Sequence, residues 1–284
     1  MRRPAPFGVR TLILVALLAA GFWAWQLLDL GLDGLTPSEG GMQKAWQFVR
    51  GAWNPSWTAQ DEHFAGTPLW PDALDAARLT VVFAAAGVGL AILIGAVLGF
   101  FGSTAWWAGD TRGGFVRRAV APAIYGVTRV LITGLRSIHE VLWAIVFACI
   151  WPEDMAFAAT IAIVIPYSGT FAKVFSEMID EAPRDAAFAL RAAGARPLHV
   201  FAFGLVPRAL PEIAAYSLYR FECGLRAAAV LGWFGIPTLG EKIMRSDENN
   251  YYGEVWLYLY TLLALILVVE WWSGAVRKRL VHSE

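Results

Sequence analysis

The chain has 284 residues, of which 57% are hydrophobic and only 16% are charged. A soluble domain is roughly a quarter charged, so this composition excludes an ordinary soluble enzyme and predicts an integral membrane protein. The formal net charge is +0, which gives no indication of a nucleic-acid partner. The two cysteines, Cys149 and Cys223, lie inside apolar stretches, so we expect neither a disulfide framework nor a metal site from them.

The first apolar stretch predicts a retained membrane anchor within residues 1–31. Residues 11–28 are uncharged and just long enough for a helix to cross a bilayer, and several arginines precede them. A cleaved signal peptide is the alternative, because basic residues followed by an apolar run also mark secretion. The bulky side chains of residues 22–27 make a poor cleavage site, and we therefore expect an anchor.

Residues 32–75 predict a loop on the outer side of the membrane, because they are polar, acidic and rich in Gly, Pro and Trp. Within this loop, residues 42–53 have an amphipathic pattern that includes Trp46 and Trp53. Tryptophan side chains suit the headgroup layer of a bilayer. An ordinary surface helix in an outer loop would explain the pattern equally well.

Five further apolar stretches predict the spans of a core that covers residues 76–274. They are residues 79–109, 119–151, 155–175, 210–233 and 255–272. Small residues in the first of them favour close packing of helices in lipid. Together with the anchor, they predict an all-α protein with about six transmembrane helices, followed by a tail at residues 275–284.

Charged residues interrupt two of these spans and are the candidate functional side chains of the membrane region. Arg136 and Glu140 are four residues apart, as are Glu222 and Arg226, so each pair would share one face of a helix. A neutralised pair that fixes helix packing is one interpretation, and a polar wall along a substrate path is the other. We expect Arg220 to face the path or the seam of a dimer, and the Glu222–Arg226 pair mainly to hold packing. The complete set of candidate path residues is Arg129, Arg136, Glu140, Arg220, Glu222 and Arg226.

The polar interval between the spans predicted at residues 155–175 and 210–233, residues 181–211, predicts two short helices joined by a tight turn. Pro183 suits the first turn of a helix, where no N–H is needed. Gly194 ends this helix, because glycine takes the left-handed conformation at no steric cost. The second helix is bounded by prolines, with Pro197 at its start and Pro207 and Pro211 at its end.

The distribution of basic residues predicts which side of the membrane each loop occupies. Arginines and lysines gather in the N-terminal segment, in residues 112–118, in the interval 181–211 and in the tail. The opposite loops contain few bases, and acidic residues dilute them. Basic loops stay in the cytoplasm, so we expect both termini and the interval 181–211 to be cytoplasmic.

The interval 181–211 resembles the coupling loop of the inner-membrane permease subunits of ABC importers. The signature of that family is Glu-Ala-Ala, three residues, Gly, nine residues, Ile, one residue, Leu-Pro. Counted from Gly194, its Glu falls on Phe188, its first Ala on Ala189, and its Leu-Pro on Val206 and Pro207. The alanine, glycine and proline keep their spacing, whereas the glutamate is replaced.

Further segments resemble the permeases of phosphonate and phosphite importers, over roughly residues 72–270. These segments are residues 136–140, residues 219–222 with Arg226, and residues 230–232. Relatives carry a glycine-rich run after these segments, and this chain departs from that pattern, with Gly-Ile-Pro-Thr-Leu-Gly at residues 235–240.

The resemblance implies a type I ABC importer permease fold in a bacterial inner membrane, with coupling helices on the cytoplasmic side. The implied partners are cytoplasmic ATPase subunits, an outer substrate-binding protein, membrane lipid and a second permease copy or homologue. The implied cargo is a small phosphorus oxyanion, phosphonate or phosphite, moved by alternating access. The charged residues of the spans would then line the path or the seam between two permeases.

Other readings stay open at this point. An importer permease for an amino acid or another oxyanion is the nearest alternative, and an ion channel or a membrane-embedded enzyme is further away. The chain contains no Gly-x-x-x-x-Gly-Lys-Ser/Thr phosphate loop, so the ATPase must be a separate subunit. Its four histidines are scattered, so we expect no metal site, no cofactor and no enzymatic activity of its own.

Overall fold

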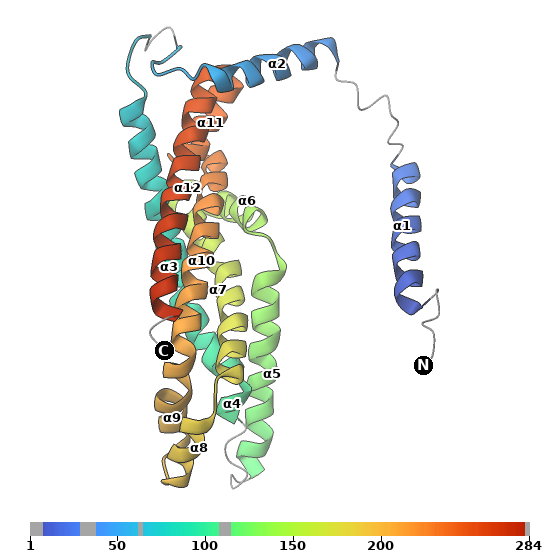
Figure 1. Cartoon of the computed structure of the whole chain (residues 1–284), viewed down its shortest axis with the longest axis vertical. Coiled ribbons are helices and arrows are strands. Elements are labelled where there is room, and N and C mark those ends of the chain that lie inside the picture. The colour runs from blue at the N-terminus through green and yellow to red at the C-terminus, as the bar shows by residue number, and fades with distance from the viewer. Residues whose placement is uncertain (1–7, 29–37, 62–64, 108–114, 282–284) are drawn as a thin grey trace. The chain divides into compact units, whose positions relative to one another are not determined.

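The structure is a computed structural model that describes residues 8–28, 38–61, 65–107 and 115–281 (Figure 1). The chain divides into two compact units, residues 1–53 and residues 54–284, and each is considered by itself. Regular structure in the described residues is helical, apart from an isolated bridge between Thr58 and Pro68. The predicted all-α class is therefore confirmed.

The first unit contains an apolar helix and an amphipathic helix. The apolar helix, α1 (Val9–Leu27), occupies the position predicted for the anchor. The amphipathic helix is α2 (Glu39–Trp53). Its exposed apolar side chains recur at helical spacing along one side, at Met42, Trp46, Val49 and Trp53.

The second unit is a bundle of long helices with short connecting helices. Its elements are α3 (Trp70–Gly102), α4 (Thr104–Trp107), α5 (Phe115–Ser137), α6 (Glu140–Ile150), α7 (Met155–Glu181), α8 (Asp185–Ala192), α9 (Pro197–Val200), a π-helical turn (Phe201–Leu205), α10 (Val206–Leu231), a 3-10 turn (Gly232–Phe234), α11 (Leu239–Glu248) and α12 (Tyr252–Val281). The short helices α4, α8 and α9 lie at one end of the bundle, and α11 lies at the other (Figure 1).

Within the described residues, four helices are long and apolar enough to cross a membrane by themselves. They are Trp70–Gly102, Met155–Glu181, Pro197–Phe234 and Tyr252–Leu280. The bent pair formed by α5 and α6 adds a fifth if it counts as one broken span, and α1 contributes a shorter apolar helix. The predicted number of about six is thus reached only when α1 and the bent pair are both included.

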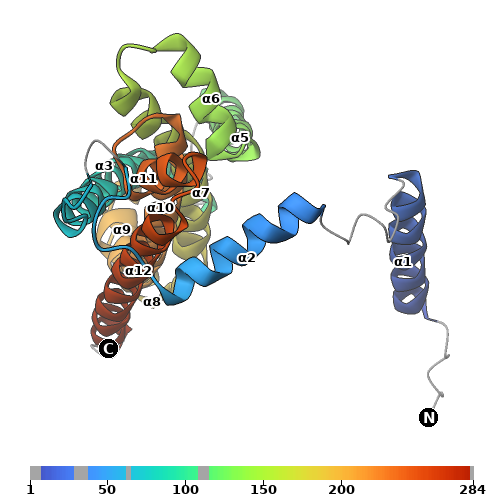
Figure 2. The same cartoon turned by 90° about the horizontal axis from the view of Figure 1, so that it is seen from above.

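The span predicted at residues 119–151 is not one helix, which corrects the prediction. α5 ends at Ser137, and α6 leaves it at an angle of 86° (Figure 2). His139 has extended backbone between them, and its Nδ1 accepts a hydrogen bond from the Val141 N–H at 3.4 Å. This side chain caps α6, so the chain stops one helix and starts another inside the apolar stretch.

The helix α7 is the centre of the bundle and by far the most buried of the long helices. A Cβ atom at Gly95 of α3 would lie 2.5 Å from the Cβ of Phe171, which is fully buried. One at Gly169 would lie 2.9 Å from the carbonyl oxygen of Ile132 in α5. Glycine therefore lets α3 and α5 both pack directly against α7, as close packing in lipid requires.

Polar contacts tie the loop after residue 54 to the end of the bundle that carries α11. Gln60 donates its backbone N–H to Glu254 Oε1 at 2.6 Å, and Ser246 Oγ donates to Glu254 Oε2 at 3.0 Å. Lys242 of α11 pairs with Asp72 of α3 at 2.9 Å. The carboxylate of Glu254 thus joins the loop, α11 and α12 at a single point.

Candidate functional site

The predicted turn at Gly194 has the expected geometry. Gly194 has φ +81°, and its N–H donates to the Arg191 carbonyl at 3.0 Å. The next N–H, of Ala195, donates to the Leu190 carbonyl at 3.0 Å. These two bonds form the Schellman motif that satisfies the last carbonyls of a helix, here α8. The prediction of a left-handed glycine at this position is confirmed.

The second short helix does not end at Pro207 and Pro211, which corrects another prediction. α9 continues through the π-helical turn into α10, so residues 197–234 form one continuous helical segment. Pro207 lies in the first turn of α10, where a missing N–H is tolerated, and Pro211 lies within the helix. The wider π turn changes the hydrogen-bond register just before the first proline, so the segment does not break.

The two short helices form a compact unit, called the coupling segment below and comprising residues 181–211. Ala187 of α8 is buried, and a Cβ at Gly204 would lie 3.1 Å from the Ala187 Cα. Phe201 packs edge-on against Phe100 of α3, with ring centroids 4.8 Å apart. The π turn therefore packs directly on α8 and on the end of α3, which makes the coupling segment continuous with the bundle core.

The outer surface of the coupling segment is available to a partner. Phe188, at the position of the signature glutamate, is 58% exposed. Ala189, Gly194 and Pro207 are also exposed, and Val206 is half-buried. A small cavity of about 100 Å³ beside Phe188 is lined by Ala105, Arg184, Ala187, Phe188, Arg191 and Leu205. The surface thus combines an exposed aromatic ring with arginine side chains.

Sequence reasoning missed Asp180, which fixes the end of α7 next to the coupling segment. Its carboxylate accepts hydrogen bonds from Ser103 Oγ at 2.6 Å, from Thr104 N at 3.0 Å and from Ala105 N at 2.9 Å. These donors lie at the start of α4, so Asp180 joins α7 to the end of α3. A carboxylate one residue before a predicted loop gave no signal for a partner so distant in the sequence.

The second candidate site is a charged cavity between the α5–α6 break, α7 and α10. Its volume is about 450 Å³. It is lined by His139, Glu140, Val141, Tyr167, Arg220, Cys223, Arg226, Ala227 and Val230. The structure therefore brings together three of the predicted path residues, Glu140, Arg220 and Arg226, from two different helices.

Arg220 is positioned in the cavity by an aromatic ring rather than by a carboxylate. Its guanidinium carbon lies 4.2 Å from the centroid of the Tyr167 ring. Its Nε atom is buried and has no hydrogen-bond partner among the described residues. A cation over an aromatic face is stabilised without losing its hydrogen-bonding capacity at the edge of the guanidinium. Arg220 thus keeps donors for a ligand or for water.

The expected Glu222–Arg226 pair is not formed, which corrects the prediction. Glu222 Oε1 accepts a hydrogen bond from Arg277 of α12 at 3.1 Å, and the Glu222 side chain is only 6% exposed. A buried carboxylate needs a partner, and here a neighbouring helix supplies it. Arg226 is left exposed and lines the cavity.

The expected Arg136–Glu140 pair is also wrong, because the helix break separates the two residues. Arg136 is exposed in the last turn of α5, whereas Glu140 begins α6. The side chain at ion-pair distance from Glu140 is that of His139, whose Nε2 lies 3.5 Å from the carboxylate. The four-residue spacing predicts a shared face only within one continuous helix.

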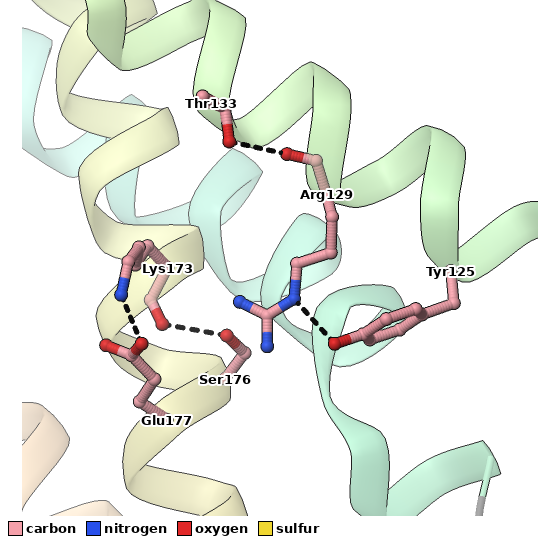
Figure 3. Close-up of polar contacts among 6 residues, drawn as sticks. All are labelled: Tyr125, Arg129, Thr133, Lys173, Ser176 and Glu177. Atoms are coloured by element: carbon pink, nitrogen blue, oxygen red, sulfur yellow. Dashed lines mark hydrogen bonds and ion pairs between the residues drawn. The ribbon is translucent and has the colours of Figure 1, made fainter.

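Arg129 lies on the side of α5 that faces α7 and does not line the charged cavity (Figure 3). Its Nε donates to the Tyr125 hydroxyl at 3.1 Å, one helical turn away. On α7, Lys173 pairs with Glu177, while Ser176 Oγ donates to the Lys173 carbonyl at 2.7 Å. The predicted path residues therefore lie in separate places. Glu140, Arg220 and Arg226 line the cavity, Arg129 faces α7, Glu222 pairs with Arg277, and Arg136 is exposed at the end of α5.

The electrostatics of the cavity favour an anion. Arg220 and Arg226 are two permanent cations, and Glu140 is the one carboxylate among the lining residues. A concave site with an excess of one sign of charge raises the local concentration of the opposite ion. The described residues contain no cluster of three or more His, Cys, Asp or Glu side chains that could hold a metal.

Comparison of the sequence with known proteins identifies a matching family and several similar proteins. The model of the family described as binding-protein-dependent transport system inner membrane component matches residues 90–282. A phosphite transport system permease protein of Stutzerimonas stutzeri is 32% identical over 202 residues, which cover 70% of this chain and 68% of that protein. A putative cryptic phosphonate transport system permease protein of Escherichia coli K12 is 25% identical over 43% of this chain and 99% of that protein.

Solved structures share the fold. A chain of an amino acid ABC transporter superposes with a TM-score of 0.60 and 14% identity, over 74% of this chain and 94% of that one. A chain of the methionine ABC transporter MetNI, in an inward-facing conformation, superposes with a TM-score of 0.57 and 18% identity, over 86% and 99%. The helical bundle is therefore the fold of ABC importer permeases, as the type I resemblance implied.

Proposed function

Because the chain belongs to the family of binding-protein-dependent transport system inner membrane components, we propose that it carries a small phosphorus oxyanion across the membrane. The observation that supports this cargo is the cavity in which Arg220 and Arg226 face a single carboxylate. Relatives described as phosphite and phosphonate permeases support the same cargo. As a family of transport components, these proteins are not enzymes themselves, and a separate ATPase drives them.

The proposed complex contains two permeases, two cytoplasmic ATPase subunits and an outer substrate-binding protein in a bacterial inner membrane. Both termini and the coupling segment face the cytoplasm in this proposal, as the basic loops favour. The ATPase docks on the exposed face of α8 around Phe188 and Gly194. Ala189, Val206 and Pro207 complete the docking region at the positions that match the signature.

The continuity of α9, the π turn and α10 supports a direct mechanical link in this mechanism. Arg220 and Arg226 lie on the same helical segment as the coupling segment. Arg220 lies ~21 Å along α10 from Val206 at 1.5 Å per residue. When ATP closes the ATPase subunits, movement of the coupling segment is passed to these arginines without an intervening loop. The cavity is then exposed to one side of the membrane after the other.

The other charged residues have different roles in this proposal. Glu222 holds α10 to α12 through Arg277 and does not contact the cargo. Arg136 is exposed at the end of α5 and is assigned to the seam between two permeases. Arg129 donates a hydrogen bond to Tyr125 on the side of α5 that faces α7. It is assigned to the same seam or to the inner end of the path.

The test is uptake by the complete transporter in proteoliposomes with its ATPase and binding protein. Wild-type protein is expected to take up phosphite or a phosphonate in an ATP-dependent way. Arg220→Gln should reduce uptake strongly while leaving basal ATP hydrolysis nearly unchanged, because Arg220 forms no ion pair that folding depends on. If the transporter takes up an amino acid in an ATP-dependent way and takes up no phosphorus oxyanion, the proposed cargo is wrong. Conductance without ATP would replace the importer with a channel.

A further inference from the structure

The carboxylate in the charged cavity is an unexpected component of an anion site. Glu140 begins α6, and its side chain is 19% exposed. Its contact at ion-pair distance is His139, at 3.5 Å, and no described arginine or lysine reaches it. The two arginines of the cavity are therefore not neutralised by Glu140, and the carboxylate oxygens remain available to a ligand.

The charges that face the cavity add up to a small positive value. Arg220 and Arg226 carry one positive charge each and Glu140 carries one negative charge, while His139, Tyr167 and Cys223 are the other titratable lining groups. A singly charged anion balances this set when the histidine is neutral. A doubly charged anion would exceed it and would place its second charge near the carboxylate, which is unfavourable.

The hydrogen-bond donors and acceptors of the cavity also favour a singly charged, protonated anion. The arginine N–H groups need acceptors, which every oxyanion supplies. The Glu140 carboxylate only accepts hydrogen bonds, so it needs a donor on the ligand. An oxyanion that still carries a P–OH group supplies both, and the resulting O–H···O⁻ bond is a strong charge-assisted one. Sulfate carries no proton at neutral pH and would bring a lone pair towards the carboxylate.

We propose that Glu140 makes the cavity selective for singly charged, protonated phosphorus oxyanions, such as hydrogen phosphite and hydrogen alkylphosphonates, over sulfate. Arg220, oriented by Tyr167, binds the ionised oxygens, and Glu140 accepts the P–OH hydrogen bond. The inference rests on the proposed function, because it requires that the cavity lie on the transport path. Its volume of about 450 Å³ leaves room for water around a small oxyanion, which keeps binding weak enough for release.

The chain contains its own reporter for this site. Cys223 lines the cavity, and the remaining cysteine, Cys149, lies on α6 outside its lining. In the Cys149→Ala background, Cys223 is the one cysteine left in this chain for N-ethylmaleimide, and its labelling is followed on the permease band alone. The permease is reconstituted with its ATPase subunits and without the binding protein, so that the selectivity of the binding protein does not contribute. The alkylation rate is then measured as phosphite or sulfate is added.

Phosphite is expected to slow the alkylation of Cys223 at concentrations where sulfate has no effect. Glu140→Gln should reduce the ratio of the half-protecting concentrations of sulfate and phosphite about 10-fold, because an amide can also donate to sulfate and the charged acceptor is lost. Glu212→Gln is the control, since Glu212 is exposed on α10, the helix that carries Cys223, and lies outside the cavity lining. This control should leave the ratio unchanged.

The inference is overturned if sulfate protects the wild-type cavity as well as phosphite does, or if Glu140→Gln keeps the wild-type ratio. Equilibrium dialysis with labelled phosphite and labelled sulfate gives the same ratio where alkylation is slow or Glu140→Gln lowers the yield. Failure of the proposed function has a different signature, which is the absence of ATP-dependent phosphite uptake by the wild type. Intact uptake with an unselective cavity would overturn the role of Glu140 alone.

Discussion

Replacing Arg277 by methionine tests the contact that joins α10 to α12. The Arg277→Met change removes the partner of Glu222, whose side chain is 6% exposed, while the Arg277 side chain itself is 30% exposed. At an N···O distance of 3.1 Å and an effective dielectric constant of about 20, the gross attraction is roughly 5 kcal/mol. Partial exposure of the arginine reduces this value. The expected loss of stability is about 3 kcal/mol, because an unpaired carboxylate is left buried.

The measurement is thermal unfolding of the purified protein, followed through tryptophan fluorescence, with Arg226→Met as the matched comparison. A loss of about 3 kcal/mol corresponds to a fall in Tm of about 6 °C or more. Arg226→Met should change Tm by much less, since Arg226 is exposed and has no partner in Glu222. The double variant Glu222→Met/Arg277→Met should recover most of the loss, because it leaves no stranded charge. If Arg226→Met is the unstable variant and Arg277→Met is not, the assigned pair is wrong.

Three further predictions concern coupling, topology and the membrane surface. Gly194→Val should abolish stimulation of the ATPase by loaded binding protein, and Gly194→Ala should be milder, because φ is +81° and β-branched residues are strained there; normal stimulation in Gly194→Val contradicts the coupling role. In a background without native cysteines, a cysteine at Asp247 should react with an impermeant reagent from outside and one at Ser283 should not, and the reverse labelling refutes the topology. A spin label at Trp46 should be accessible to oxygen in lipid and one at Lys44 to an aqueous relaxant; equal aqueous exposure would place α2 away from the bilayer.

Local features of the chain were predictable because they depend on nearby residues. The apolar stretches gave the long helices, and Gly194 gave a left-handed turn that the structure confirms. The charged pairs were wrong because the four-residue spacing assumes an unbroken helix whose residues pair with each other. Glu222 instead pairs with Arg277, which is distant in the sequence, and a capping His139 divides the other pair.

The error at the prolines has a different physical origin. Pro207 and Pro211 are helix breakers by intrinsic preference, but α10 continues through Pro211, and Pro207 directly follows the π turn and lies in the first turn of α10, where a missing N–H is tolerated. A sequence pattern does not contain a signal for this turn. The hydrogen bonds to the Asp180 carboxylate were missed because all of their donors come from residues 103–105, which are distant from Asp180 in the sequence.

The π turn at Phe201–Leu205 also sets the rotational phase of α10 relative to the coupling segment. A π turn contains about one residue more than an α turn, which corresponds to a rotation of about 100° in the helix that follows. This one surplus residue therefore sets the direction in which Arg220 and Arg226 point relative to α8. Deleting one residue there would remove the π turn, so either α8 would rotate by about 100° relative to α10, or the face of α10 that carries Arg220 would leave Tyr167. Because the coupling segment and the cavity arginines lie on one continuous helical segment, a rotation of that segment about its axis at one end also turns the side chains at the other end.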